Sequence, residues 1–187
     1  MKVVIVGGVA GGATAAARIR RLDEQAEIVV FERSGYISYA NCGLPYYIGG
    51  VIEDAEELTL QTPESFFRRF GIHMKVRHEV TAIHPEKKTV SVKNLETGAV
   101  FEESYDKLLL SPGAKPVWPD LPGMDSDRLF TLRTVEDTLR IKKFVDQNKP
   151  RSAVMVGGGF IGLEVAENLR ELGLEVTIVQ RPKQLMN

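Results

Sequence analysis

Cysteine is almost missing from this chain, since Cys42 is the single one among 187 residues. A lone thiol cannot form an internal disulfide, which excludes a disulfide-stapled secreted scaffold and is typical of a reducing compartment such as the cytoplasm. Any sulfur chemistry must therefore proceed through a mixed disulfide with a partner molecule, or through oxidation of the single sulfur.

Long apolar segments and an excess of one charge are missing as well. No segment approaches the roughly 20 apolar residues that span a bilayer, so a membrane location is not predicted. The formal net charge is -1, which gives no electrostatic reason to expect nucleic acid as a partner. The three histidines at positions 73, 78 and 84 are interpreted as residues of the β-structure without metal-ligand partners, and no metal site is predicted.

What the chain does contain is a repeated order of strand, glycine-rich turn, helix and strand. In the first copy these elements are predicted at residues 3–6, 7–12, 13–22 and 27–32. In the second copy they are predicted at 153–156, 157–162, up to about 172, and 175–179. Apolar β-branched strands joined by helical crossovers indicate parallel sheets, so the fold class is α/β and Rossmann-like.

A smaller β-structure is predicted between the two copies. From His73 onward the apolar period becomes 2, which indicates the strands of an inserted β-meander with a hairpin turn at 94–98. Residues 107–110 then return to the main sheet. Thr134 and Asp137 resemble a capping box that opens a helix ending near residue 148.

Both glycine turns have the spacing of a phosphate-binding loop. In the first copy, valine replaces the middle glycine, and the loop consists of Gly7, Gly8, Val9, Ala10, Gly11 and Gly12. Glu32 lies 20 residues beyond Gly12, where an acid that binds a ribose hydroxyl is expected. The alternative for Glu32 is an exposed carboxylate at a strand end.

The second loop is complete, with Gly157, Gly159 and Gly162. Gln180 followed by Arg181 stands where the ribose-binding acid would be. An acid favours the bare 2′-hydroxyl of NADH, whereas a neutral residue followed by a cation accommodates the 2′-phosphate of NADPH. The sequence favours NADPH and leaves NADH open.

Cys42 begins a segment, 42–50, that predicts a helix or helical turn ending at two glycines. The positive end of a helix dipole favours a thiolate. The alternative is that this cysteine is a small buried hydrophobic residue, as most free cysteines are. The phosphate-binding loop just upstream favours redox chemistry.

Three segments, 6–12, 31–33 and 38–45, resemble the coenzyme A disulfide reductases, the single-cysteine branch of the FAD-dependent pyridine nucleotide-disulfide oxidoreductases. The Ser-x-x-Asn-Cys-Gly core that contains Cys42 is specific to this branch, whereas glycine loops are not. The resemblance implies the first part of an FAD-binding domain at 1–115, a connection and helix at 116–149, and an incomplete NAD(P)-binding domain at 150–187. We therefore expect the chain to be the N-terminal fragment of a longer protein, which would be a cytoplasmic homodimer.

The resemblance also implies roles for single residues. FAD would be held by the first loop together with Glu32, Arg33, Val80, Pro112 and Gly113. Cys42 would form a mixed disulfide with coenzyme A, and the substrate would be bound by Thr14, Arg18, Arg21, Ser38 and Asn41. The family has a further basic contact near residue 70, where this chain has Phe70, so that Arg68 or Arg69 would have to substitute.

The implied activity is NAD(P)H-dependent reduction of coenzyme A disulfide, or of another low-molecular-weight disulfide or persulfide. Two alternatives stay open. One is an NADH oxidase or peroxidase that cycles the cysteine through sulfenic acid. The other is a catalytically silent fragment that only binds nucleotide.

Overall fold

The computed structural model describes residues 1–186, which divide into two compact units. The first consists of Met1–Tyr39 and Thr59–Ala114, and the second of Ala40–Leu58 and Lys115–Asn187. The predicted α/β class is confirmed, because each unit combines helices with parallel strands. The division into an FAD-binding and an NAD(P)-binding domain concerns cofactors and stays a prediction.

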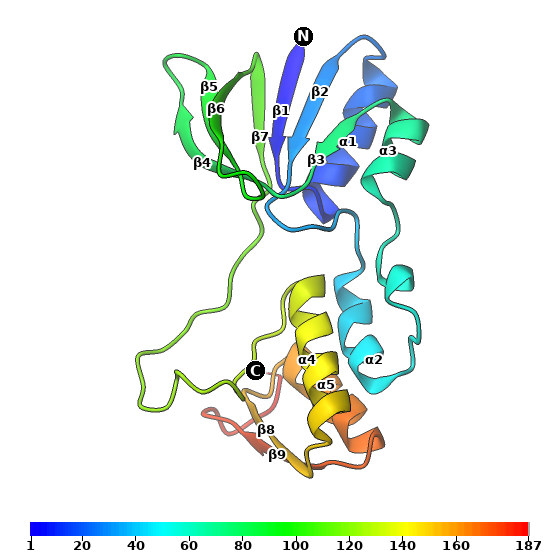
Figure 1. Ribbon diagram of the computed structural model, residues 1–187, viewed down its shortest axis with the longest axis vertical. Coiled ribbons are helices and arrows are strands. Elements are labelled where there is room, and N and C mark those ends of the chain that lie inside the picture. The colour runs from blue at the N-terminus through cyan, green and yellow to red at the C-terminus, as the bar shows by residue number, and fades with distance from the viewer. Residues whose placement is uncertain (187) are drawn as a thin grey trace. The chain divides into compact units, whose positions relative to one another are not determined.

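A four-stranded parallel sheet forms the centre of the first unit (Figure 1). Its strands occur in the spatial order β3-β2-β1-β7. Their bounds are β1 Lys2–Val6, β2 Glu27–Phe31, β3 His73–Lys75 and β7 Lys107–Leu110. This is the βαβ arrangement that the first sequence repeat predicts, extended by one strand on each side.

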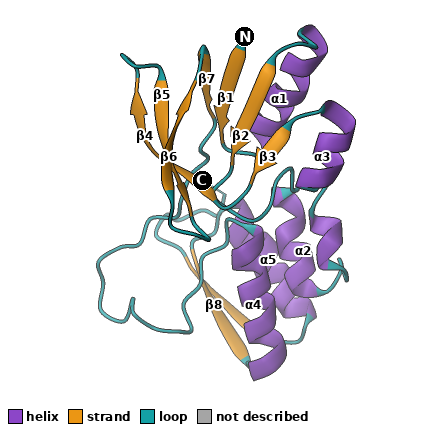
Figure 2. Ribbon diagram, turned by 45° about the horizontal axis from the view of Figure 1, so that its top comes forward, coloured by secondary structure: helices purple, strands orange, loops and turns teal. Residues whose placement is uncertain are grey.

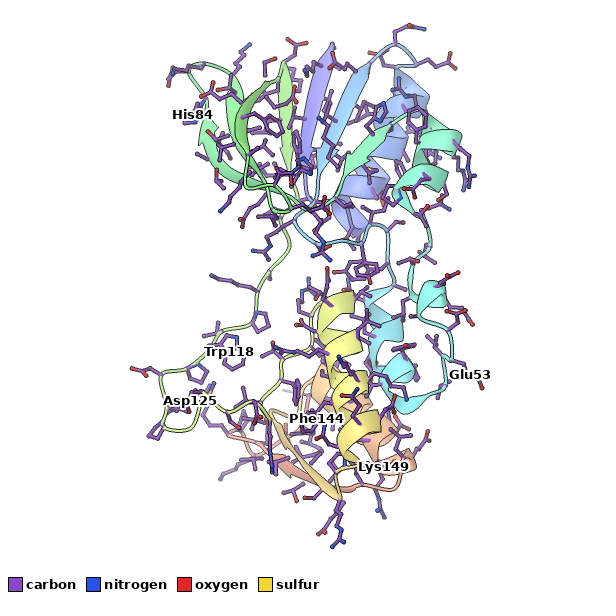
Figure 3. The ribbon with its side chains drawn as sticks, viewed as in Figure 1. Glu53, His84, Trp118, Asp125, Phe144 and Lys149 are labelled. Carbon is purple, nitrogen blue, oxygen red and sulfur yellow. The ribbon has the colours of Figure 1, made fainter. Side chains whose placement is uncertain are left out.

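The antiparallel meander of the first unit consists of β4 His78–His84, β5 Thr89–Asn94 and β6 Val100–Ser104. His84 lies at the end of β4 (Figure 3), with its Nε2 2.9 Å from Oγ of Ser91. The prediction that the strands from His73 onward all belong to the meander is wrong for β3. Met74 in β3 is buried and pairs in parallel with Val30 of β2, so burial in the main sheet decides the position of this short strand.

Alternation along the strands of the first unit produces two cores, one on each face of the sheet. Helices cover one face and the meander covers the other (Figure 2). Val3 and Ile5 of β1 face the helices α1 Ala10–Leu22 and α3 Pro63–Phe70. Val4 faces the other way, and packs with Val90 and Val92 of the meander. Because successive side chains of a strand point to opposite faces, five-residue strands are enough to join the two layers.

Lys2, the first residue of β1, forms ion pairs with acidic residues of β2 and β6. Its Nζ lies 2.6 Å from Oε1 of Glu103 on β6 and 3.0 Å from Oε1 of Glu27 on β2. The hydrogen bond to Glu103, followed by that to Glu27, raises the pKa of Lys2 above its ordinary value. The ammonium group is therefore charged at neutral pH and joins the sheet to the meander.

The second unit packs three helices on a two-stranded parallel sheet. The helices are α2 Leu44–Gly49, α4 Val135–Asn148 and α5 Phe160–Glu171, and the strands are β8 Ser152–Val156 and β9 Glu175–Val179. Short 3-10 turns, η1 Asn41–Gly43 and η2 Ala55–Leu58, flank α2. Ile48, Ile141 and Leu169 each come from a different helix and meet in one core.

Helix α4 begins with the predicted capping box. Oγ1 of Thr134 accepts from the N–H of Asp137 at 3.2 Å, and Oδ2 of Asp137 accepts from the N–H of Thr134 at 3.1 Å. The helix ends at Asn148, and its C-cap residue Lys149 (Figure 3) adopts a left-handed conformation with φ of 44°. Because both hydrogen bonds at the N-terminus join residues only three apart, the sequence predicts where this helix begins.

Helices α2 and α5 come into close contact at Gly49. A Cβ atom at Gly49 would overlap Oδ1 of Asn168, which is 2% exposed. The Asn168 side chain is fixed by donation from its Nδ2 to the carbonyl oxygen of Glu164 at 2.8 Å. Glycine at this position therefore sets how closely the helix that follows Cys42 approaches α5.

We expect Gly49→Ala to lower the free energy of unfolding by about 1–3 kcal/mol, because the added methyl group overpacks a buried contact. Asn168→Ala removes two of the three overlapping atoms, Oδ1 and Cγ, and leaves only Cβ, so the double variant should be more stable than the sum of the single effects predicts. Chemical denaturation of the four proteins measures this coupling. Strictly additive effects would show that Asn168 is not the group that requires glycine.

Candidate functional site

The first glycine loop is closed tightly against its own unit. Gly7 has φ of 98°, and a Cβ there would overlap the carbonyl oxygen of Ser111 at the end of β7. A Cβ at Gly12 would overlap the carbonyl oxygen of Gly7. Helix α1 begins at Ala10, three residues earlier than predicted, because Gly11 and Gly12 belong to its first turn.

The N-terminus of α1 fits a phosphate group. Among residues 1–186, no side chain caps this helix, whose N-cap residue is the half-buried Val9. Ala10 and Gly11 are exposed, so the first backbone N–H groups are open to a ligand. Uncapped N–H groups at the positive end of a helix dipole bind anions.

Glu32 and Ser38 lie beside the first loop. The Glu32 carboxylate directly follows β2, and accepts from the N–H of Gly8 and from the N–H of Ser34, each at 2.7 Å. The N–H of Ser38 donates to the carbonyl oxygen of Gly8 at 3.0 Å. Ser38 has φ of 46°, a left-handed conformation that is uncommon outside glycine and clusters at functional sites.

Other residues predicted to hold FAD lie at separate points of the first unit. Pro112 and Gly113 follow β7 and are exposed, next to the first loop. Val80 lies at an irregularity in the pairing of β4 with β5 and packs on the core beneath the meander. Arg33 is exposed, with Nη1 3.6 Å from Oε1 of Glu79.

The predicted phosphate-binding face of α1 exists as a surface. Thr14, Arg18 and Arg21 are all exposed, and their spacing of four and three residues places them on one side of the helix. The buried residues of this helix are Gly12, Ala13 and Ala16. A cationic stripe next to a hydroxyl group suits a phosphorylated ligand.

Arg20 forms a contact with the end of α3 that was not predicted from the sequence. Its Nε donates to the carbonyl oxygen of Phe70 at 2.9 Å and joins α1 to the end of α3. Arg69 lies over the ring of Phe70, 5.2 Å from its centroid. Arg68 and Arg69 are exposed, so cations surround the position where the family has a basic residue. A contact across 50 residues leaves no local sequence signal.

Cys42 lies in the middle of η1, in the second unit, and is exposed. The next residue but one begins α2, and the N–H of Gly43 donates to the carbonyl oxygen of Ala40 at 3.0 Å. Asn41 is exposed as well. The alternative of a buried hydrophobic cysteine is therefore wrong, and the thiol is accessible at a helical turn that precedes a helix.

The second glycine loop repeats the geometry of the first. Gly157 has φ of 102°, and its N–H donates to the carbonyl oxygen of Val179 at 2.9 Å. A Cβ at Gly162 would overlap the carbonyl oxygen of Gly157, whereas a Cβ at Gly159 would have no atom within 4 Å. Within the described chain no side chain caps α5. Open space at Gly159 is what the approach of a pyrophosphate requires.

Gln180 takes the place in the second loop that Glu32 has in the first. Its Oε1 accepts from the N–H of Gly158 at 2.8 Å, and its Nε2 donates to the carbonyl oxygen of Gln184 at 3.1 Å. Arg181 follows and is exposed. The side chain that accepts from the loop N–H is thus a carboxylate in the first loop and a carboxamide in the second, and the middle position is Val9 in the first and Gly159 in the second.

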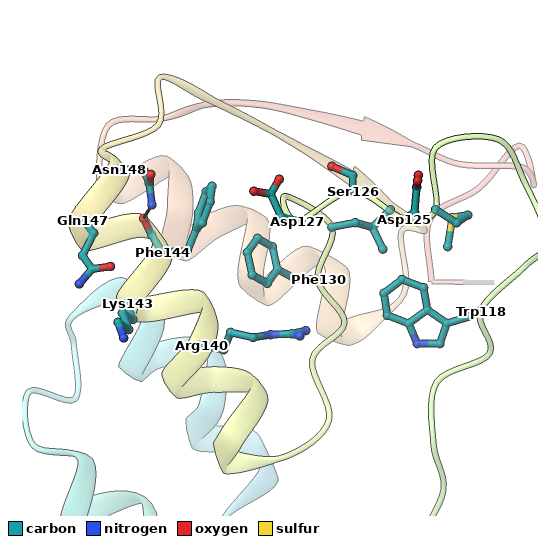
Figure 4. Close-up of a pocket in the computed structure, with 12 residues that line it drawn as sticks. Trp118, Asp125, Ser126, Asp127, Phe130, Arg140, Lys143, Phe144, Gln147 and Asn148 are labelled. Atoms are coloured by element: carbon teal, nitrogen blue, oxygen red, sulfur yellow. Dashed lines mark hydrogen bonds between the residues drawn. The ribbon is translucent and has the colours of Figure 1, made fainter.

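A separate hollow of about 360 Å³ lies between α4 and the connection that precedes it (Figure 4). Trp118, Phe130 and Phe144 line it, together with Arg140, whose guanidinium lies 5.2 Å from the centroid of the Phe130 ring. None of the predicted site residues is part of its lining.

Residues 1–186 contain neither a cluster of potential metal ligands nor a helix that could span a membrane. No three side chains of histidine, cysteine, aspartate or glutamate gather there as potential metal ligands. None of the helices in the same range has the length and apolar character that crossing a membrane requires.

The fold and the two glycine loops are features of proteins that bind dinucleotides, and comparison with known proteins identifies the family of this chain. The model of the pyridine nucleotide-disulphide oxidoreductase family matches residues 1–187. The chain belongs to this family, and the resemblance found in the sequence is confirmed.

Individual relatives are more specific. The chain is 49% identical over 184 residues to a coenzyme A disulfide reductase of Staphylococcus aureus, covering 98% of this chain and 41% of the relative. The solved structure of reduced Bacillus anthracis CoADR-RHD is 55% identical with a TM-score of 0.97, over 99% of this chain and 33% of the other. A water-forming NADH oxidase from Lactobacillus brevis, solved with NADH bound, is 34% identical with a TM-score of 0.91, over 100% of this chain and 41% of the other. The chain thus spans less than half the length of these relatives.

Proposed function

We propose that this chain provides the FAD-binding region and the first part of the NAD(P)H-binding region of a flavoprotein that reduces coenzyme A disulfide, or a related low-molecular-weight disulfide or persulfide. Cys42 is the proposed redox-active residue. The homodimeric state and cytoplasmic location expected for the full-length protein belong to the same proposal.

The observation that carries this proposal is the exposed Cys42 at a helical turn, in a chain 49% identical to a coenzyme A disulfide reductase. An exposed thiol with no second cysteine in the chain can form a covalent bond only with an external sulfur or with an oxidant. The cationic face of α1 supports a phosphorylated thiol compound as the substrate, since Arg18 and Arg21 are exposed on one side.

The residues present fit both cofactors. The uncapped N-terminus of α1 and the Glu32 carboxylate would hold the pyrophosphate and the ribose of FAD, and the uncapped N-terminus of α5 would hold those of NAD(P)H. FAD, when bound, supplies the two-electron chemistry that links the nicotinamide to sulfur.

The part of the reaction that belongs to this chain is a thiol–disulfide exchange. The Cys42 thiolate attacks one sulfur of the substrate disulfide, so that a new S–S bond forms, the old one breaks, and the second half leaves as a thiolate. Two electrons and a proton must then return the mixed disulfide to the Cys42 thiolate and a second free thiol. Asn41 and Ser38 would orient the substrate during the exchange.

The similarity to a water-forming NADH oxidase suggests a second candidate function. In that function the Cys42 thiolate attacks a peroxide, so that an S–O bond forms, the O–O bond breaks and hydroxide leaves. Two electrons and two protons then return the sulfenic acid to the thiol and release water, without any substrate thiol. The cationic face with Arg18 and Arg21 favours the disulfide reductase, because oxygen and peroxide have no phosphate for it to bind.

Flavin absorbance and a panel of acceptors test the proposal on the full-length protein. We expect a bound flavin spectrum, and NAD(P)H oxidation at least about tenfold faster with coenzyme A disulfide or a coenzyme A persulfide than with oxygen or peroxide. Oxygen or peroxide as the faster acceptor would establish the oxidase function instead. A protein purified without flavin, and unable to take it up, would support the nucleotide-binding fragment.

A further inference from the structure

Asn168 of α5 is buried in the second unit, yet its amide oxygen is unsatisfied. The residue is 2% exposed, and among residues 1–186 its Oδ1 accepts no hydrogen bond. Its Nδ2 donates to the carbonyl oxygen of Glu164 at 2.8 Å, within the same helix. A buried carbonyl oxygen without a donor costs stability, so stability alone does not account for asparagine at this position.

Gly49 of α2 is the residue that this side chain faces. A Cβ at Gly49 would overlap Oδ1, Cγ and Cβ of Asn168. Gly49 is the last residue of α2 and does not have a positive φ, so its backbone conformation does not require glycine, which is a poor helix former. Close approach to Asn168 requires glycine instead, and the pair therefore fixes the separation of α2 and α5.

The other end of α2 is joined directly to Cys42. The N–H of Leu44 donates to the carbonyl oxygen of Asn41, so the turn that contains the thiol continues into the helix. Ile48 is fully buried in the core that α2 forms with α4 and α5, which lie beside it (Figure 1). At a helical rise, Gly49 lies about 10 Å from Cys42. A shift of α2 against α5 therefore moves the thiol as well.

We propose that Asn168 is a positioning residue for Cys42, because its contact with Gly49 sets where α2, and with it the thiol, lies during sulfur exchange. This inference rests on the proposed function, in which Cys42 is the nucleophile. The Cys42 thiolate forms a bond to one sulfur of the substrate disulfide while the other sulfur leaves as a thiolate. Such a step requires aligned reacting atoms, and a misplacement of about 1 Å can cost about 10²-fold in rate.

The position of Asn168 separates this role from the binding of the nicotinamide dinucleotide. Asn168 lies in the last turn of α5, whereas the second glycine loop precedes the first turn. Replacement of Asn168 is therefore expected to slow the sulfur exchange and to leave the supply of electrons from NAD(P)H unchanged. A general loss of packing would slow both steps.

The test is the rate at which the reduced full-length protein forms the mixed disulfide with coenzyme A disulfide in a single turnover, followed by mass spectrometry. Gly49→Ala should slow this step about tenfold or more, because the methyl group displaces α2 from α5. Asn168→Ala should slow it about threefold or more, because α2 loses the group that fixes its position. The double variant should be about threefold faster than Gly49→Ala, since two of the three overlapping atoms are removed. Reduction of the bound flavin by NAD(P)H, measured by its absorbance, should stay within about twofold of the parent protein in all three variants.

Val176→Ala is the matched control. Val176 is a partly buried residue of the same core and lies on β9, so its replacement should lower stability while the exchange rate stays within about twofold of the parent. Should Gly49→Ala fail to fold, Asn168→Ala decides the question alone. An unchanged exchange rate in Asn168→Ala, or an equal slowing in Val176→Ala, would overturn the positioning role and leave the proposed function standing. A parent protein that forms no mixed disulfide would overturn both.

Discussion

Replacement of Cys42 by serine is expected to reduce the turnover of coenzyme A disulfide at least about 10³-fold in the full-length protein, because the variant lacks the proposed nucleophile of the mixed disulfide. A serine hydroxyl is not ionised near neutral pH and cannot exchange with a disulfide. Steady-state NAD(P)H oxidation with the disulfide as acceptor measures the loss.

The same variant should leave the protein otherwise intact. Cys42 is exposed and lies in a short 3-10 turn, and exposed substitutions usually change the free energy of unfolding by less than about 0.5 kcal/mol. Flavin absorbance and the denaturation midpoint are therefore the controls. Turnover equal to that of the parent protein would remove Cys42 from the mechanism, whatever the acceptor.

Much of the fold was predictable because local signals and tertiary packing agree. The strands at both glycine loops are short apolar runs, which is what burial on both faces of a parallel sheet requires. The capping box at Thr134 identified the start of α4 because its hydrogen bonds involve residues only three apart. The start of α1 was placed three residues late, since glycine is a poor helix former and Gly11 and Gly12 hid the first turn.

Other features depend on contacts that no local pattern contains. Three residues of β3 are too few to distinguish a meander strand from a strand of the main sheet by period alone. The overlap between Gly49 and Asn168 joins helices that are far apart in the sequence. The contact of Arg20 with Phe70 has the same character. Such pairs become visible only in three dimensions.

The residues of the candidate site also divide into those whose positions the spacing predicts and those whose conformation depends on distant contacts. The contacts of Gly7, Gly12 and Glu32 within one glycine turn were predictable from spacing, because such a turn is a local structure with a fixed distance to the end of the next strand. The left-handed backbone of Ser38 was not predictable, because its N–H donates to the carbonyl oxygen of Gly8, a contact across 30 residues that has no local sequence signal. Spacing therefore identifies the residues of such a site, whereas their conformations require the structure.

Substitution by alanine should affect stability differently at two glycines of the second loop, Gly162 and Gly159. At Gly162 the added methyl group meets the carbonyl oxygen of Gly157, which is backbone and cannot move aside. We expect Gly162→Ala to lower the free energy of unfolding by about 3 kcal/mol or more, since overpacking against backbone is costly. At Gly159, where φ is -79° and no atom lies within 4 Å, alanine should change stability by less than about 0.5 kcal/mol.

The effect on nucleotide binding should be the reverse of the effect on stability, with the main loss in Gly159→Ala. The space at Gly159 is where backbone must approach the pyrophosphate, so Gly159→Ala should weaken NADP⁺ binding about tenfold or more while the protein remains fully folded. Calorimetry and chemical denaturation, applied to both variants of the full-length protein, measure the two effects independently. A Gly159→Ala variant that binds as tightly as its parent would show that the ligand does not approach this turn. A Gly162→Ala variant of unchanged stability would show that the loop relaxes away from the helix, so that close packing of α5 on Gly157 is not what requires glycine there.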